Sequence, residues 1–586
     1  MPKNNMTLRI GGEAGQGVES GAMGLAKTLA RGGLHVFGLN DYMSRIRGGY
    51  NFMHIRVNEN PVYTHIDPIH LIIAFNTEAA ESHLADIPAG GGVIFDEGLK
   101  KLDTSTWADR QVQAFPMPLA SIAKDVGGSP IMLNTAAIAG ALGITNYEFR
   151  RMAEVITQNF ARKGQKVVDS NIRVAEAAYE YGQKNYAGTF DWELSPVDAP
   201  PRMVINGNQA ISMGAIAGGC RFISAYPMTP GTSVLEYLTA KAGKFGIVTK
   251  QTEDELAAIL FAIGASHAGV RAMTTTSGGG FCLMVEALGL AGTTETPVVI
   301  VLAQRGGPST GLPTRTEQPD LEFAIHASHG EFPRIILTPG TIEQCFESGH
   351  RAHNLAEKYQ LPVIIMTDLY QATSFRTVEL DALDFAGVSI DRGKTLMPED
   401  VGEETNGYYR YALAEDGISP RLVPGHEKGV YVAVGDEHHE DGSITEDSEP
   451  RNEQMRKRMQ KLETALPEIH PPEYYGAEEP EVTLVGWGST RGALVESVDR
   501  LNSYGTRASM IHFSEIWPFP VEATERLLAR CRNTITVEQN YTGQLANVIR
   551  EQTGHKVDRR LNKYDGRQIS PDEIVSSVRV GVALNV

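Results

Sequence analysis

Short apolar runs alternate with segments of helical length from the first residues of the chain. The first runs are TLRI, HVFGL, HLIIAF and GGVIFDE, at residues 7–10, 35–39, 70–75 and 91–97. This alternation is typical of doubly wound α/β domains, in which helices join parallel strands. It predicts fold class α/β and a first domain over residues 1–185, which a proline-containing linker at 186–200 follows.

A second series of apolar runs predicts another doubly wound α/β domain over residues 201–375. Its runs are MVING, RFISA, VRAMTTTS, PVVIVLAQ, PRIILTP and LPVIIMTD. Residues 376–475 are acidic, rich in glycine and proline and weakly periodic, so we expect an irregular arm that ends in the charged helix EQMRKRMQKLETAL. The runs VTLVGWGST, RASMIHFSEIWPF and NTITVEQN predict a third α/β domain over residues 476–586.

Charge and cysteine usage exclude several classes of partner. The net charge of −18 argues against a nucleic acid or an anionic membrane surface. No apolar run approaches the roughly eighteen residues of a membrane span, and no signal peptide precedes the first strand, so we expect a cytoplasmic protein. Cys220, Cys282, Cys345 and Cys531 lie far apart without a C-x-x-C pair. The sequence therefore predicts no metal site and no iron–sulfur cluster on this chain.

Glycines follow the first predicted strand in the segment GGEAGQG. Gly12, Gly15, Gln16 and Gly17 stand between a strand and a helix, where backbone N–H groups and the helix dipole can bind an anion. Close packing of strand and helix without a ligand explains the glycines equally well. The segment RIRGG adds Arg45 and Arg47 beside two glycines, which suits a phosphate or an exposed basic edge.

The segment YPMTPGTS, residues 226–233, holds Thr229 in a stiff turn because two prolines bracket Met228 and Thr229. By itself the segment predicts a strand-to-helix corner, with Thr232 or Ser233 as the cap of the next helix. A rigid threonine hydroxyl is also suited to contact a ligand with little loss of entropy.

Glu255 begins the segment ELAAILFAIGASHAG, which is apolar and rich in small residues. Thr252 and Glu255 have the spacing of a capping box, so Glu255 has a structural explanation. Small residues also allow a subunit or a planar cofactor to pack closely, and a poorly solvated carboxylate has a shifted pKa. TTTSGGGF then places Ser277 and Gly278 at a strand end, where doubly wound sheets bind ligands.

Two arginines, Arg305 and Arg315, stand in the loop QRGGPSTGLPTRTEQPDL after another buried strand. Arginine binds carboxylates with two parallel hydrogen bonds, so a keto acid is a natural ligand. A structured surface loop with solvated charges is the alternative, but the loop's length and position favour a functional role.

These motifs, in this order, resemble the 2-oxoacid:ferredoxin oxidoreductases, specifically the α subunit of two-subunit enzymes. The motifs are GNQAISMGAIAGG, YPMTPGTS, TEDELAAILFAIGASHAG, TTTSGGGF and QRGGPSTGLPTRTEQPDL. GGEAGQG and RIRGG look like the family's gamma domain, fused ahead of a pyrimidine-binding domain and a C-terminal transketolase-C-like domain. PSTGLPTRTEQPDLEFAIHASHGEFP, GISPRLVPG and GDEH look most like the 2-oxoglutarate branch.

The resemblance implies roles for the residues noted above. Glu255 would hydrogen-bond the aminopyrimidine of thiamine diphosphate, and Thr229 and Arg305 would meet the 2-oxoacid substrate. The resemblance also implies cofactor contacts from Tyr226, Pro227, Ser277 and Gly278, and Gly12, Gly15, Gln16, Gly17 and Arg47 are candidates for a coenzyme A or anion site. A five-carbon diacid needs a second cation, for which Arg315 is a candidate and the partner chain is the alternative source.

The chain lacks a G-D-G motif followed by an N-N pair, which holds Mg²⁺ and the cofactor diphosphate in that family. The resemblance therefore implies a separate β subunit that carries Mg²⁺ and a 4Fe–4S cluster, an (αβ)2 assembly, and ferredoxin as electron acceptor. The expected reaction is oxidation of 2-oxoglutarate and coenzyme A to succinyl-CoA. Pyruvate or a branched-chain or aryl 2-oxoacid is an alternative substrate, and a non-catalytic subunit that binds coenzyme A or a nucleotide is an alternative of another class.

Overall fold

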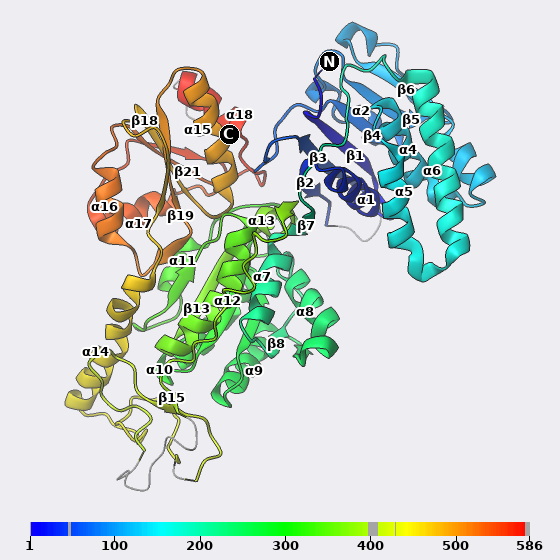
Figure 1. Ribbon diagram of the computed structural model, residues 1–586. Coiled ribbons are helices and arrows are strands. Elements are labelled where there is room, and N and C mark those ends of the chain that lie inside the picture. Colours follow the sequence, from blue (N-terminus) through cyan, green and yellow to red (C-terminus); the bar gives the residue numbers. More distant parts are fainter. Residues whose placement is uncertain (1, 45–47, 397–407, 428, 581–586) are drawn as a thin grey trace. The chain divides into compact units, whose positions relative to one another are not determined.

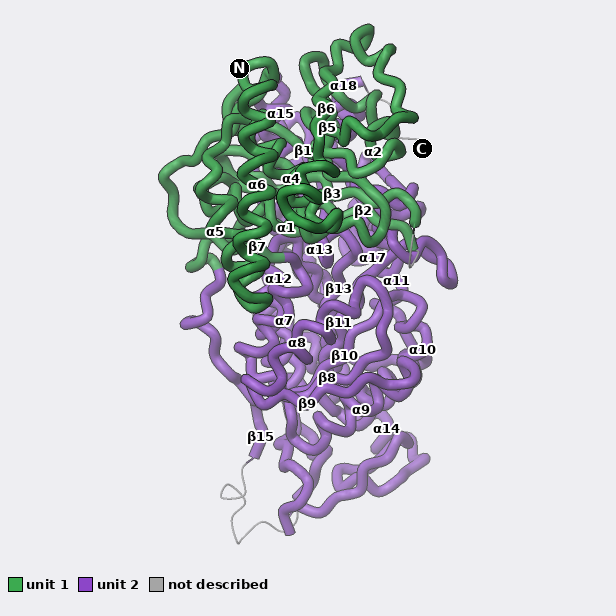
Figure 2. The backbone as a smooth tube through the Cα atoms, turned by 90° about the vertical axis from the view of Figure 1, so that its right-hand side faces the viewer, with its two compact units in different colours: residues 1–205, 374–382 green, residues 206–373, 383–586 purple. Residues whose placement is uncertain are grey.

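The computed structural model describes residues 2–44, 48–396, 408–427 and 429–580 (Figure 1). The chain forms two compact units, one of residues 1–205 with 374–382 and one of residues 206–373 with 383–586 (Figure 2). Both units combine β-sheets with covering helices, which confirms fold class α/β. The predicted domain boundaries remain predictions. Over the described ranges, no helix combines the length and apolar character that crossing a membrane requires.

The first unit contains an eight-stranded sheet in the order β6-β5-β4-β1-β3-β2-β14-β7. Its strands are β1 (Met6–Glu13), β2 (His35–Asp41), β3 (Tyr50–Asn58), β4 (Leu71–Ala74), β5 (Gly92–Asp96), β6 (Gln113–Met117), β7 (Arg202–Asn206) and β14 (Phe375–Glu379), and its longer helices are α1 (Val18–Arg31), α4 (Leu133–Ile144), α5 (Phe149–Phe160) and α6 (Gln165–Tyr186).

This sheet is mixed, so the expectation of a parallel sheet is wrong for the part that contains β3, β2 and β14. β1, β4, β5 and β6 are parallel, but β3 runs antiparallel to both β1 and β2. Gly48 and Gly49, with φ of 74° and 79°, lie just before β3, and such φ angles suit a sharp reversal of the chain. The sequence suggested a phosphate site or an exposed basic edge just before β3, and the strand itself was not predicted.

MVING was expected to open the second α/β series, but it forms β7 at the edge of the first sheet. β14, from residues 375–379, pairs antiparallel with β2 and lies between β2 and β7. Arg202 of β7 contacts Glu379 of β14 at 2.6 Å and donates to the carbonyl of Gly33 at 2.6 Å. The chain therefore returns to the first unit after leaving it, a long-range pairing that local periodicity does not reveal.

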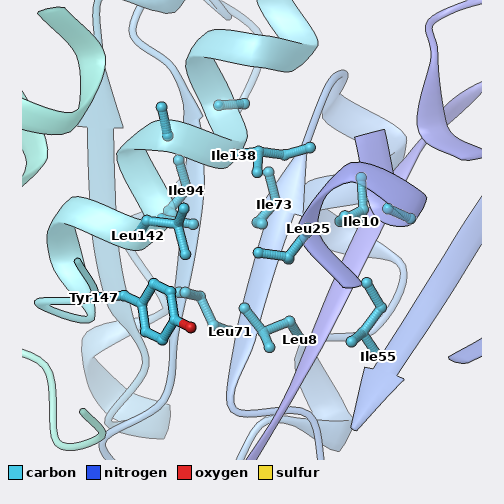
Figure 3. Close-up of a cluster of buried hydrophobic side chains, with 14 of the residues drawn as sticks. Leu8, Ile10, Leu25, Ile55, Leu71, Ile73, Ile94, Ile138, Leu142 and Tyr147 are labelled. Carbon is cyan, nitrogen blue, oxygen red and sulfur yellow. The ribbon is translucent and has the colours of Figure 1, made fainter. Parts of the chain in front are cut away.

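The core of the first unit lies between one face of the sheet and helices α1 and α4. Figure 3 shows strand residues Leu8, Ile10, Ile55, Leu71, Ile73 and Ile94 with helix residues Leu25, Ile138 and Leu142. Leu8 and Ile10 are two residues apart on β1, so they point to the same face. Both are at most 1% exposed. This buried face fixes the register of β1, since a shift of one residue would place Arg9 in the core.

The second unit contains a seven-stranded sheet in the order β20-β12-β13-β11-β10-β8-β9. Its strands are β8 (Phe222–Ala225), β9 (Val248–Gln251), β10 (Ala272–Thr276), β11 (Val298–Gln304), β12 (Ile335–Leu337), β13 (Pro362–Asp368) and β20 (Glu515–Trp517), and the main helices of this segment are α7 (Gly207–Ala217), α8 (Thr232–Phe245), α9 (Glu255–His267), α10 (Gly278–Thr293), α11 (Leu321–His326), α12 (Ile342–Tyr359) and α13 (Leu369–Thr373).

The paired strands of this sheet are parallel except β20, which runs antiparallel to β12. β20 lies in the run RASMIHFSEIWPF, which was expected in the third domain. A five-stranded sheet, β17-β19-β18-β21-β22, follows it. Its strands are β17 (Glu473–Gly476), β18 (Val482–Trp487), β19 (Ala508–Phe513), β21 (Thr534–Glu538) and β22 (Arg559–Asn562), with helices α15 (Arg491–Ser503), α16 (Val521–Leu528), α17 (Gln544–Thr553) and α18 (Pro571–Val580).

The described parts of residues 383–447 form little regular structure, and the charged helix predicted after them is α14 (Ser448–Ala465). A short parallel pair, β15 (Thr395–Leu396) and β16 (Arg421–Leu422), lies in this arm. α14 is more than a solvated charged helix. Lys457 and Lys461 are buried and contact the carboxylate of Glu295, just after α10, at 2.6 Å and 2.5 Å.

Candidate active site

Four neighbouring parallel strands deliver the predicted site residues to one edge of the second unit's sheet. β11, β10, β8 and β9 lie side by side in that order. Their carboxyl ends lead to Arg305, to Ser277 and Gly278, to Tyr226 through Thr229, and to Glu255. The carboxyl ends of parallel strands are where doubly wound sheets bind ligands. The sheet order thus gathers motifs that are up to 80 residues apart in the sequence.

Gly278, Gly279 and Gly280 begin α10 and lie close to side chains of this site. A Cβ atom on Gly280 would lie 2.4 Å from Oε1 of Glu255 and 2.2 Å from Oγ1 of Thr276. On Gly278 it would lie 2.5 Å from Oδ2 of Asp320, and on Gly279 3.7 Å from the carbonyl oxygen of Ser309. Two carboxyl groups can approach the start of α10 this closely because Gly278 and Gly280 have no side chains.

Glu255 is the first residue of α9, and the expected capping box is wrong. The N-cap is Asp254, whose side chain accepts a hydrogen bond from the amide of Ala257 at 2.7 Å. Thr252 instead donates its hydroxyl to the carbonyl of Asp254 at 2.9 Å. Because Asp254 caps the helix, Glu255 is not needed for this purpose. The capping explanation of Glu255 therefore fails, because the N-cap lies two positions after Thr252.

The Glu255 side chain is buried without a complete set of partners. The residue is 3% exposed, and Oε1 has no hydrogen-bond partner within the described parts of the chain. Burial raises the pKa of Glu255 above its ordinary value, Asp254 adds to the rise, and Arg305 opposes it. A buried polar atom without a partner is costly, so it suits a group that pairs with a ligand. A raised carboxyl pKa in such a place is typical of functional sites.

Thr229 and Arg305 are in direct contact. Nη1 of Arg305 donates to the backbone carbonyl of Thr229 at 2.8 Å. From the other side, Asn208 of α7 donates to the carbonyl of Pro230 at 2.9 Å and to the hydroxyl of Ser233 at 2.8 Å. The proline turn is thus held by side chains from two other elements. The expectation that Thr232 or Ser233 caps α8 is wrong. The N-cap is Gly231, and no described side chain makes a capping hydrogen bond there.

Arg315 lies at the base of the same loop as Arg305, but its side chain has other neighbours. The amide of Gly306 donates to the carbonyl of Arg315 at 3.4 Å, so the backbone of the loop folds back on itself. A Cβ on Gly566 would lie 2.8 Å from Cβ of Arg315, which places the side chain against the segment after β22. Tyr226 is 39% exposed, and Ser277 is buried at the N-cap of α10.

Asp320 is a site residue that the sequence reasoning missed. It ends the loop that begins at Arg305, and its amide donates to the side chain of buried Gln304 at 3.0 Å. Its Oδ2 is buried against Gly278 without a hydrogen-bond partner in the described residues. Burial raises the pKa of Asp320 to about 7. The neighbouring Glu317 also has a pKa raised to about 7, by burial and by the negative charges of Asp565 and Asp320. An aspartate in a polar loop gives no sequence signal of such burial.

The raised pKa of Asp320 predicts a pH-dependent stability. In the unfolded chain this carboxyl ionises near pH 4, so the folded state holds an extra proton between about pH 4 and pH 7 and becomes less stable as pH rises through that window. Asp320→Asn removes this cost, and we expect it to stabilise the protein at pH 8 by up to about 4 kcal/mol and much less at pH 5. Thermal unfolding at both pH values, with the exposed Asp109→Asn as control, measures this. Equal effects at the two pH values would contradict it.

In the glycine loop of the first unit, Gly12 is tightly packed, whereas Gly15 has free space beside it among the described residues. A Cβ on Gly12 would lie 2.6 Å from Oε1 of Gln16, and Oε1 of Gln16 accepts from the amide of Glu13 at 2.7 Å. Gly17 is the N-cap of α1 with φ of 80°. At Gly15, with φ of 95°, an added Cβ would meet no atom of the described residues within 4 Å. Gly12 and Gln16 thus have a structural role in the loop. Coenzyme A binding by this loop stays a prediction. Arg45 and Arg47 lie outside the described residues.

Three family models match successive parts of the chain. The model described as pyruvate ferredoxin/flavodoxin oxidoreductase matches residues 7–181. That described as pyruvate flavodoxin/ferredoxin oxidoreductase, thiamine diP-bdg, matches residues 213–458, and pyruvate:ferredoxin oxidoreductase core domain II matches residues 480–574. The middle match contains Thr229, Glu255 and Arg305. The central part of the chain therefore matches a domain of thiamine diphosphate-binding type.

Relatives match nearly the full length. The chain is 33% identical to 2-oxoacid:ferredoxin oxidoreductase 2, subunit alpha, of Aeropyrum pernix over 98% of this chain and 97% of that protein. It is 29% identical to 2-oxoglutarate oxidoreductase subunit KorA of Mycobacterium tuberculosis over 99% and 92%. A solved 2-oxoglutarate:ferredoxin oxidoreductase from Magnetococcus marinus, with 2-oxoglutarate, coenzyme A and succinyl-CoA bound, is 33% identical, with a TM-score of 0.91 over 98% and 99% of the two chains. The chain belongs to the alpha subunits of the 2-oxoacid:ferredoxin oxidoreductase family.

Proposed function

We propose that this chain is the alpha subunit of a 2-oxoglutarate:ferredoxin oxidoreductase. The proposed reaction converts 2-oxoglutarate, coenzyme A and two oxidised ferredoxins to succinyl-CoA, carbon dioxide, two reduced ferredoxins and a proton. Some relatives are named only for 2-oxoacids, whereas the Mycobacterium tuberculosis relative and the solved Magnetococcus marinus enzyme carry the name 2-oxoglutarate. The observation that carries the proposal is Oε1 of Glu255, which is buried near Arg305 and has no hydrogen-bond partner among the described residues.

The site residues fit one half of a thiamine diphosphate site. Glu255 would hold the pyrimidine ring nitrogen, since its Oε1 is buried and has no hydrogen-bond partner among the described residues. Tyr226, Pro227 and Ser277 lie at the same sheet edge and would complete the contacts. The cofactor, when bound, supplies the carbanion chemistry that decarboxylation of a 2-oxoacid needs. The role of Glu255 is to share a proton with the ring nitrogen, for which a raised pKa is suited.

We propose that a partner β subunit completes this site with Mg²⁺ for the diphosphate and a 4Fe–4S cluster, in an (αβ)2 assembly. The relatives are named as alpha subunits, which supports a partner chain. Among the described residues no group of three His, Cys, Asp or Glu side chains could hold a metal ion. Thr229 and Arg305 would bind the substrate's 1-carboxylate and carbonyl, because a guanidinium pairs with a carboxylate in a charge-assisted bond.

The substrate is tested with the complex of this chain and its β subunit. Initial rates of coenzyme A-dependent ferredoxin reduction are compared for 2-oxoglutarate, pyruvate, 2-oxoisovalerate and phenylpyruvate. The proposal expects the highest kcat/KM for 2-oxoglutarate. A higher value for any of the other three acids would assign the enzyme to that substrate class and overturn the 2-oxoglutarate proposal.

Arg305→Ala is expected to lower kcat/KM for every 2-oxoacid by about 10- to 150-fold, which corresponds to about 1.5–3 kcal/mol for a lost charged hydrogen bond. Arg305→Lys keeps the charge but not the planar fork, so we expect an intermediate loss. Because Arg305 also holds the carbonyl of Thr229, thermal unfolding of both variants serves as control. An unchanged kcat/KM for Arg305→Ala would remove Arg305 from the substrate site.

Arg315→Ala is expected to lower kcat/KM for 2-oxoglutarate more than for pyruvate, if Arg315 binds the distal carboxylate that only 2-oxoglutarate carries. The contact of its side chain with Gly566 makes this the more demanding of the two substrate predictions, because a ligand must reach that side of the loop. Rates with both acids measure the ratio. Equal losses on the two substrates would show that Arg315 does not bind the distal carboxylate.

A further inference from the structure

The loop that carries Arg305 and Arg315 has two parts with different partners. Residues 305–315, which we call the tip, fold back on themselves, because the amide of Gly306 donates to the carbonyl of Arg315 at 3.4 Å. Residues 316–320, which we call the stem, bond instead to other elements of the second unit. The tip holds both arginines, so the position of the stem bears directly on where they lie.

Gln318 lies in the middle of the stem, and its polar groups bond to the ends of two strands of the five-stranded sheet. Its backbone amide donates to the carbonyl of Gln539 at 2.6 Å, and its side-chain Oε1 accepts from the amide of Gln539 at 3.2 Å. Its Nε2 donates to the carbonyl of Trp487, the last residue of β18, at 3.0 Å. Its backbone carbonyl accepts from the side chain of Asn540 at 3.2 Å. Gln318 is fully buried, and glutamine suits this place because its amide is both donor and acceptor.

The residues beside Gln318 bond to the same part of the second unit. The amide of Thr316 donates to the carbonyl of Gly566, after β22, at 3.3 Å. Gln544 is the first residue of α17, and its Nε2 donates to the carbonyl of Pro319 at 2.7 Å. Its Oε1 accepts from the amide of Glu322, just after the stem, at 3.0 Å. The stem is thus held along its length by segments that follow β18, β21 and β22.

The tip and the stem differ in burial. Residues 307–312 of the tip are exposed, whereas Thr316 and Gln318 of the stem are buried. The amide of Asp320 donates to the side chain of Gln304 at 3.0 Å, which joins the end of the stem to the strand residue before the loop. An exposed loop tip takes its position from its two ends. One end of this tip continues β11, and the other end is the anchored stem.

We propose that Gln318 is a positioning residue for the 2-oxoacid substrate. By anchoring the stem to the five-stranded sheet, it holds the tip in the place where Arg305 and Arg315 meet the substrate. This inference rests on the proposed function for the identity of the ligand. A displacement of about 1 Å caused by a distant change costs about 100-fold in rate, so an anchor away from the chemistry has a measurable effect. The five-stranded sheet then contributes to substrate binding without contacting the substrate.

The test uses the complex of this chain with its β subunit and the variant Gln318→Met. Methionine keeps the length of the side chain but removes its bonds to Trp487 and Gln539, while both backbone bonds of residue 318 remain. We expect KM for 2-oxoglutarate to rise at least about 10-fold and kcat to change less than about threefold. A role in stability alone would lower the amount of active enzyme, and hence kcat, and leave KM unchanged.

A second variant weakens the anchor from the other side. Gln544→Met removes the bonds to Pro319 and Glu322 from a residue at the start of a helix, and we expect a smaller rise in KM in the same direction. The matched control is Gln454→Met in α14. Gln454 is also a buried glutamine, 1% exposed, and donates to the carbonyl of Tyr411 at 2.8 Å in the arm. We expect its KM to stay normal, and thermal unfolding checks the fold of all three variants.

Hydrogen exchange measured by mass spectrometry on the same complexes gives a readout that does not need activity. The amides of Gly306, Leu312 and Arg315 are bonded within the tip. We expect them to exchange at least about 10-fold faster in Gln318→Met and at the wild-type rate in Gln454→Met, because loss of an anchor loosens the segment that it holds. Unchanged exchange in the tip of a folded Gln318→Met would overturn the proposal.

The outcomes separate this inference from the proposed function. Faster exchange in the tip with an unchanged KM would also overturn the proposal, because the stem would then be only structural. If the wild-type complex oxidised no 2-oxoacid, the proposed function would fail, while faster exchange in Gln318→Met would still support the anchor. If the wild-type complex is active on 2-oxoglutarate and Gln318→Met keeps its KM, the function stands and the positioning role of Gln318 fails.

Discussion

The Glu255→Gln variant is expected to lose at least about 100-fold in turnover while it keeps its fold and its β subunit. General acid–base catalysis by a placed side chain contributes about 100- to 10,000-fold, and glutamine cannot share a proton with the pyrimidine nitrogen. The helix cap is untouched, because Asp254 and not Glu255 accepts the capping bond. Steady-state rates of 2-oxoacid oxidation by the complex measure the loss.

Glu253→Gln is the matched control for this prediction. Glu253 lies two residues before Glu255 and is exposed, so the same chemical change there tests the loss of one surface charge. We expect near-normal turnover from this control. If Glu255→Gln also turned over at a near-normal rate, Glu255 would be a buried structural residue and the cofactor assignment would lose its main support.

The second large effect is expected in stability, from Glu295→Gln. Glu295 is fully buried, and its carboxylate contacts Lys457 and Lys461 of α14. Burial by itself would raise the pKa of Glu295, but the two lysines outweigh it and hold the pKa well below its ordinary value. Glutamine leaves two buried ammonium groups without a counter-charge. Removing one partner from a buried ion pair costs about 3–5 kcal/mol, so we expect a lowered unfolding midpoint in denaturant.

Two further variants separate charge pairing from packing at this position. Glu286→Gln changes an exposed glutamate of α10, and we expect it to leave the midpoint nearly unchanged. The triple variant Glu295→Leu, Lys457→Met and Lys461→Met removes all three charges together, and apolar replacement of a whole buried ionic group is often neutral or stabilising. A triple variant as unstable as Glu295→Gln would show that packing, and not unpaired charge, sets the cost.

Local patterns predicted the fold class and most strands of the second unit, because parallel strands buried on both faces read as continuous apolar runs. They missed β3, because Gly48 and Gly49 just before it gave a turn signal, and they assigned β7 and β20 to the wrong sheets. Pairings such as β7 with β14 join residues about 170 apart, and no local window carries that information. Local sequence patterns thus predict the alternation of strands and helices, but they do not predict the order in which strands pair in a mixed sheet.

The sequence also indicated which site residues come together, but less well how they are held. Thr229 and Arg305 were predicted to act on one ligand, and the structure brings them into contact through the backbone carbonyl of Thr229. The capping box at Thr252 was wrong because Asp254 caps the helix instead, which shifts the helix start by two positions. Asp320 and the buried Lys457 and Lys461 were missed, since burial of a charged side chain depends on tertiary packing.

The most direct test of the thiamine half-site is an add-back measurement on the complex of this chain with its β subunit. The complex is freed of thiamine diphosphate, and the rate of ferredoxin reduction by 2-oxoglutarate is followed while thiamine diphosphate, coenzyme A or the β subunit is omitted in turn. The account predicts that wild type recovers its full rate only with all three present, and that Glu255→Gln recovers about 1% or less. A full rate without thiamine diphosphate, or from this chain alone, would contradict it.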